Sequence, residues 1–129
     1  MTSSPGWYVA VLVVESAVDD GVAREPLVDL QYRLVRAANP EAAHRRALEL
    51  GREAEHSYQN AGGANVTWTC VGLHDLCEVF ARDLVDGVEV YSRLVRSDAS
   101  LHVVPKERLS IFRSEANKHK TAQDLLDGE

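Results

Sequence analysis

The run WYVAVLVVES at residues 7–16 limits most strongly how this chain can fold. Successive side chains of a β-strand point to opposite faces of its sheet, and here both alternating sets are apolar. The two sets are Trp7, Val9, Val11 and Val13, and Tyr8, Ala10, Leu12 and Val14. A strand with this pattern is expected to be covered on both faces. The molecule must therefore place one layer on each side of this strand.

A second strand is predicted over LVDLQYRLVRA, residues 27–37, because apolar and polar side chains alternate cleanly there. The polar stretch AVDDGVAREP before it, with Gly21 as a turn residue, predicts a hairpin with the first strand. One set of its side chains is expected to point inward and the other outward. The inward set is Val28, Leu30, Tyr32 and Leu34, and the outward set is Asp29, Gln31 and Arg33.

Residues 39–63 carry the clearest helical pattern. Asn39 can cap the helix, Pro40 suits its first position, and Glu41 lies at the positive end of the helix dipole. An apolar stripe is expected to pack on the sheet, and two glycines are expected to end the helix. The stripe is Ala43, Ala47, Leu50, Ala54 and Tyr58, and the glycines are Gly62 and Gly63.

Two further strands complete the predicted sheet. The first is NVTWTCVGL at 65–73, with Trp68 inside and Gly72 at a possible bulge. The second is DGVEVYSRLVR at 86–96, with Val88, Val90, Ser92 and Leu94 facing the core. The predicted fold is α+β: a four-stranded antiparallel sheet in ββαββ order, with strand order 2-1-3-4 and one packed helix.

The composition changes near residue 96, which predicts a compact domain over 1–96 and a C-terminal appendage over 97–129. All three lysines of the chain lie in this appendage. Its later part is expected to form a helical tail from about Glu107, with Leu109, Phe112 and Ala116 on one side. The second face of the sheet needs a cover, either this appendage or a second copy in an isologous dimer. We favour the homodimer.

Charge and composition exclude several classes of function. A net charge of −6 and a pI near 5.3 argue against a nucleic-acid partner, which needs a basic stripe to bind phosphates. The sequence has no apolar run long enough to span a membrane and no basic segment typical of a signal peptide, so we expect a cytoplasmic protein. Cys70 and Cys77 are expected to be reduced thiols. The histidines show no metal-binding spacing, and no cofactor is expected.

Four segments carry a resemblance to a known family. They are WY at 7–8, SYQNAGGANVTW at 57–68, VGLHDL at 71–76 and GVEVYSR at 87–93. Together they resemble a small bacterial family catalogued as domain of unknown function 4288, over about residues 7–93. The resemblance implies a compact α+β domain, and it implies no activity.

Several polar residues form the predicted ligand- or partner-binding site. They are Glu15, Tyr58, Asn60, Trp68, Glu89, Tyr91 and Arg93. A carboxylate beside an arginine and two phenols can orient a polar ligand or a basic peptide through charge-assisted hydrogen bonds. A purely structural alternative is that Glu89 pairs with Arg93 on the surface while Tyr58 and Asn60 join the helix end to the next strand.

No catalytic signature is present, and no residue is assigned a catalytic role. We therefore predict a non-catalytic binding or interaction module that acts through a face of the sheet and has a protein partner. Whether the chain is an enzyme is left open. The alternative is a small enzyme, such as a hydrolase, that uses a pocket of Glu, Tyr and Arg side chains.

Overall fold

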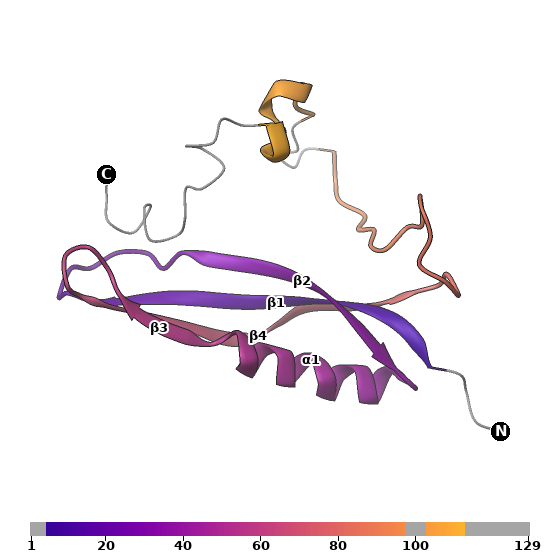
Figure 1. The fold of residues 1–129 in the computed structure, drawn as a ribbon, viewed down its shortest axis with the longest axis horizontal. Helices are drawn as coiled ribbons and strands as arrows, with labels where there is room; N and C mark the ends of the chain where they lie inside the picture. Colours follow the sequence, from indigo (N-terminus) through magenta and orange to yellow (C-terminus); the bar gives the residue numbers. More distant parts are fainter. Residues whose placement is uncertain (1–4, 98–102, 113–129) are drawn as a thin grey trace. The chain divides into compact units, whose positions relative to one another are not determined.

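A computed structural model describes residues 5–97 and 103–112 of the chain, which divides into two units, Met1–Ser92 and Arg93–Glu129. The first unit is an α+β domain. Its elements, in chain order, are β1 (Gly6–Asp19), β2 (Val28–Ala37), α1 (Pro40–Ala54), β3 (His56–Gln59) and β4 (Asn65–Val79). The strands form a four-stranded sheet in the order β2-β1-β4-β3, with every neighbouring pair antiparallel (Figure 1).

Strand β1 lies inside the sheet, and both of its faces are covered, as its sequence predicts. On one face, Ala10, Leu12 and Val14 are at most 1% exposed. We call this the helix face, because Gly51 of α1 lies against Cys70, which pairs with Val14. On the other face, Val9 and Val11 are also buried. We call this the second face.

Helix α1 begins where the sequence predicts it. The Asn39 side chain accepts a hydrogen bond from the Ala42 amide at 2.8 Å, and Pro40 is the first helical residue. Ala43, Ala47 and Leu50 are buried, as expected for the stripe that packs on the sheet. Figure 1 shows α1 along one side of the sheet only. The helix therefore supplies one of the two layers that β1 requires.

The predicted end of the helix at Gly62 and Gly63 is wrong. The helix stops at Ala54, and His56–Gln59 instead forms β3, which pairs with the start of β4. The turn between them is closed by Asn60, whose side-chain Oδ1 accepts hydrogen bonds from the amides of Gly62 and Ala64, each at 3.0 Å. Pairing with β4 satisfies backbone groups over this stretch in a way that the local helical pattern cannot reveal.

Strand β4 contains the irregularity predicted at Gly72 and a second one. Its register against β1 advances by one extra residue at Val71 and again at His74. Each extra residue exchanges the two faces of the strand, so the second advance restores the original alternation. Asp75 pairs with Val11 and Cys77 with Val9, which places both side chains on the second face.

The predicted fourth strand over 86–96 is absent. In the first unit, residues 80–92 form no strand, and they turn at Val85–Val88, where Gly87 has φ +85°. Strand β3 occupies the outer edge of β4 over Asn65–Trp68 only. Beyond Trp68, two register shifts make that edge irregular for a partner strand. Instead, Ala81 and Tyr91 pack against the buried cluster of Val9, Val11 and Val79. This segment thus covers β1 on the second face.

The inward side predicted for that strand is also wrong. Val90 is 43% exposed and Leu94, which belongs to the second unit, is fully exposed, whereas Tyr91 is the side chain that contacts the core. Once the segment lies across a sheet face instead of beside a strand, alternation no longer decides which side chains are buried.

The predicted inward set of β2 is wrong as well. Val35 is the buried residue of this strand, at 2% exposure. The four alternate apolar residues lie on the second face and are 43–53% exposed. We call them the β2 row: Val28, Leu30, Tyr32 and Leu34. The segment over 80–92 covers β1, and within the first unit it reaches this row through Tyr91, whose ring meets the Tyr32 ring edge-on at 5.4 Å.

The second unit contains no α-helix among its described residues, so the predicted helical tail is not found there. Two 3-10 turns are present, η1 (Lys106–Arg108) and η2 (Ser110–Phe112). Segments this short gain little from helix formation on their own. Ala116, the last residue of the predicted stripe, lies outside the described residues.

Candidate functional site

A carboxylate with two donors lies on the second face at the end of β4. Asp75 Oδ2 accepts a hydrogen bond from Tyr91 Oη at 3.0 Å and another from Cys77 Sγ at 3.2 Å. Asp75 Oδ1 accepts from the Leu76 amide at 2.9 Å. Asp75 and Cys77 share a face because they are two residues apart in a strand, and Tyr91 reaches them because residues 80–92 cross that face.

These contacts shift the three ionisable groups in opposite directions. Hydrogen bonds from Cys77, then Tyr91, then the Leu76 amide lower the pKa of Asp75, because they stabilise its charged form. Loss of solvent around the thiol and the adjacent carboxylate raise the pKa of Cys77. The same two causes raise the pKa of the Tyr91 phenol. At neutral pH the group is therefore one carboxylate held between two protonated donors.

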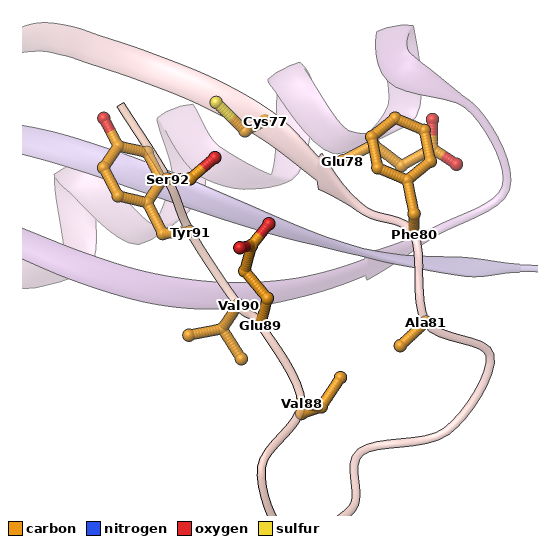
Figure 2. A pocket seen from close by; sticks show the side chains of 9 residues that line it. All are labelled: Cys77, Glu78, Phe80, Ala81, Val88, Glu89, Val90, Tyr91 and Ser92. Carbon is orange, nitrogen blue, oxygen red and sulfur yellow. The ribbon is translucent and has the colours of Figure 1, made fainter. Parts of the chain in front are cut away.

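A hollow of about 440 Å³ opens beside this group. Two arms of the chain bound it, as Figure 2 shows: one carries Phe80 and Ala81, and the other runs from Val88 to Ser92. Cys77 and Glu78, from the end of β4, complete the lining. Phe80 is 89% exposed, so its ring is open to a binding partner. The lining combines apolar surface with the two carboxylates of Glu78 and Glu89.

Two of the predicted site residues, Glu89 and Tyr91, meet at this hollow. Glu15 is also on the second face, but it lies four residues along β1 from Val11, or roughly 14 Å away. Arg93 begins the second unit, which is described separately from the first. Glu15 therefore lies outside the hollow, and Arg93 is described only with the second unit.

The other three predicted residues lie together elsewhere. Tyr58 and Trp68 are on the helix face, where the Trp68 indole nitrogen and the Tyr58 hydroxyl are 3.5 Å apart. Asn60 closes the turn between β3 and β4. These contacts agree with the structural alternative, in which the residues join the chain after the helix to the next strand. The predicted constellation is divided between the two faces of the sheet.

Sequence reasoning missed Asp75, Cys77, Glu78 and Phe80. One signal was present, since Asp75 is a carboxylate between the apolar residues Leu73 and Leu76. The two register shifts in β4 cancel, so alternation counted from Trp68 still places Asp75 on the opposite face, but it does not show which side chains Asp75 meets there. Its partner Tyr91 lies 16 residues away, across a turn that no local pattern predicts in detail.

Within 5–97 and 103–112, no three His, Cys, Asp or Glu side chains come together as a metal ion would require. In the same part of the chain, no helix is both long and apolar enough to cross a membrane.

This geometry defines a small α+β domain with a mixed apolar and acidic hollow on one sheet face. The chain belongs to the family described as Domain of unknown function (DUF4288), which matches residues 7–92. No curated protein and no solved structure matched it. The family match includes both arms of the hollow.

Proposed function

We propose that this chain is a non-catalytic interaction module that binds a partner protein through the second face of its sheet. The observation that carries the proposal is the 440 Å³ hollow between Phe80 and the arm over 88–92. It lies on the face that α1 leaves uncovered, so a partner could reach it without displacing the helix.

The lining favours a basic side chain with an aliphatic stem. Glu89 offers a carboxylate to a lysine or arginine head group, and Val88 supplies apolar surface for its methylene groups. Glu78, which pairs with Tyr8, adds negative charge at the end of β4. The exposed ring of Phe80 can also attract a cation over its face. We therefore expect the partner to present a basic, partly apolar segment to this acidic domain.

The titration behaviour supports a binding role more than a catalytic one. A nucleophilic cysteine needs a lowered pKa, and a carboxylate base working near neutral pH usually has a raised one. Here the pKa of Cys77 is raised and that of Asp75 is lowered. For this reason the interaction module is preferred to a small hydrolase built on Glu89 and Tyr91.

We further propose a cytoplasmic homodimer with its domain boundary near residue 96. Both cysteines are free thiols, which suits a reducing compartment. The β2 row supports association, because four apolar residues spaced along one strand are about half exposed.

Peptide titration followed by NMR tests the interaction role. The probe is a short capped peptide of alternating lysine and leucine, compared with one of glutamate and leucine. We expect the basic peptide to shift amide signals within residues 77–92, and the double variant Glu78→Gln/Glu89→Gln to weaken binding by roughly two- to fivefold.

Glu25→Gln is the control for each of these two substitutions, because it removes one negative charge from an exposed loop residue outside the hollow. Equal binding of both peptides, or shifts confined to other parts of the domain, would contradict the proposal. Hydrolysis of ester or amide substrates that disappears in Glu89→Gln would instead favour the enzyme.

A further inference from the structure

We infer that two copies of this chain join β2 to β2 in antiparallel fashion, with the two-fold axis at Gln31, to make one continuous sheet. The inference rests on the proposed homodimer and adds to it the interface, the register and the residues that determine them.

The two edges of the sheet differ in a way that selects β2. On one side the edge is formed by β3, only four residues long, and beyond Trp68 by β4, which carries two register shifts. Short edge strands and bulged ones both resist pairing with other chains. Strand β2 has 10 residues, and its register against β1 runs from Gly6–Ala37 to Glu15–Val28 without a shift. An uninterrupted edge strand presents a regular row of backbone donors and acceptors, to which a second strand can bind.

The polar side of β2 has a charge pattern that complements itself. Gln31 lies at the centre, where its Nε2 donates to Asp29 at 2.9 Å and its Oε1 accepts from Arg33 at 2.6 Å. A two-fold axis at Gln31 sets Asp29 of one copy opposite Arg33 of the other, twice over. Opposite charges directly across an antiparallel pair are stabilising, and like charges are destabilising.

The same register matches the apolar side. It sets Leu30 opposite the second copy's Tyr32, and Val28 opposite its Leu34, so each half-exposed residue of the β2 row gains an apolar neighbour across the axis. Pairing strands in this way joins the two rows into one apolar strip on the second face, with each helix on the other face.

Other antiparallel registers of the two β2 strands do not pair both the opposite charges and the apolar residues. An axis at Leu30 or Tyr32 sets a charged residue opposite Gln31 and leaves no opposite charges paired. An axis at Asp29 or Arg33 sets like charges opposite each other. An axis between two residues sets the apolar row of one copy beside the polar residues of the other, because directly opposed side chains share a face.

Light scattering on full-length protein, over a wide range of concentrations, measures the dimer. We expect Asp29→Arg to raise the dimer dissociation constant about tenfold or more, because two attractive pairs become repulsive. Arg33→Asp should do the same, and the double variant Asp29→Arg/Arg33→Asp should restore the parent value. Arg45→Glu, on the exposed side of α1, makes the same change in charge as Arg33→Asp and should leave dimerisation unchanged.

Oxidative cross-linking tests the register directly. Gln31→Cys places two thiols opposite each other at the axis, where Cα atoms of an antiparallel pair are about 4.5–5.5 Å apart, within reach of a disulfide. We expect Gln31→Cys to form a covalent dimer. Asp29→Cys should not, since its two copies would lie roughly 14 Å apart along the strands. The parent, with its own two thiols, gives the background.

The outcomes separate the interface from the dimer itself. If the charge variants do not change the dimer dissociation constant and Gln31→Cys forms no covalent dimer, the β2 interface is wrong, but the proposed homodimer stands. A monomer at all concentrations overturns both. Restored dimerisation in the double variant, together with cross-linking at residue 31, supports the inference.

Discussion

At the scale of single residues, Tyr91 connects the core of the domain to its candidate site. Its ring packs on Val9, Val11 and Val79 and meets Tyr32 edge-on, while its hydroxyl donates to Asp75. The sequence predicts Tyr91 on a surface that binds something, opposite a buried set of side chains. The residue does line the hollow, but it also covers the strand that most needs a layer on that side.

Removing only the hydroxyl separates these two roles. In Tyr91→Phe we expect the ring packing to remain and the pKa of Asp75 to rise towards its ordinary value, because one of its donors is lost. Titration of the Asp75 side-chain carbon by NMR measures this change. Tyr32→Phe is the control, because it removes a neighbouring hydroxyl and keeps the ring contact, while the hydrogen bond from Tyr91 to Asp75 remains.

The same variant has a consequence for stability in acid. Because the folded-state pKa of Asp75 is lowered, its contribution to stability is present above the unfolded pKa and is lost as pH falls through the folded pKa. We expect Tyr91→Phe to make this acid-induced loss smaller, as measured by urea unfolding at several pH values. An unchanged titration of Asp75 would show that the hydroxyl does not stabilise the carboxylate.

At the scale of elements, the close approach of α1 to β4 depends on a glycine. A Cβ added to Gly51 would lie 2.6 Å from Cys70 Sγ and 3.3 Å from Cys70 Cβ. The stripe on the helix is rich in alanine for the same reason, since small side chains allow the helix axis to lie near the sheet. This contact fixes how the helix sits on the sheet.

Alanine at position 51 tests this contact, because the intrinsic preference and the packing effect oppose each other. Within a helix, glycine to alanine ordinarily stabilises by about 1 kcal/mol. We expect Gly51→Ala to destabilise instead, by roughly 1–3 kcal/mol, because of overpacking against Cys70. Chemical unfolding measures the change, and the added loss should shrink when Gly51→Ala is made in a Cys70→Ala background. A Gly51→Ala protein more stable than the parent would contradict the packing.

At the scale of the whole molecule, the family match and the first unit end at the same residue, Ser92. All four strands, the helix and both arms of the hollow lie within it. The cover that β1 requires on its second face comes from residues 80–92, so neither the appendage nor a second copy is needed for that purpose. The half-exposed β2 row is the apolar surface that the appendage or a second copy has left to cover on this face.

A chain shortened to residues 1–96 tests this division. We expect it to fold, with a cooperative thermal transition in circular dichroism, and to remain dimeric by light scattering. The full-length protein is the control for both measurements. Aggregation of the shortened chain would mean that residues 97–129 cover the β2 row, and a soluble folded monomer would contradict the proposed homodimer.

The sequence alone determined those features that depend on neighbours along the chain. The double apolar pattern of residues 7–16 identified the strand covered on both faces, and Asn39 with Pro40 located the start of the helix. Gly72 indicated an irregularity in the third predicted strand. Each of these signals is local, because caps, turns and alternation act within a few residues. Glu89 and Tyr91, chosen by their residue types, both line the hollow.

Tertiary structure decided the features that depend on competition for partners. Tyr58 continues the helical stripe in the sequence, but its backbone pairs with Val66 instead, so the helix ends early. Residues 86–92 alternate like a strand, yet they form no strand beside β4 and instead cross the second face. That crossing brings Tyr91 to Asp75 and forms the hollow. Which edge is free and which face lacks a layer are properties of the assembled sheet, and no local pattern contains them.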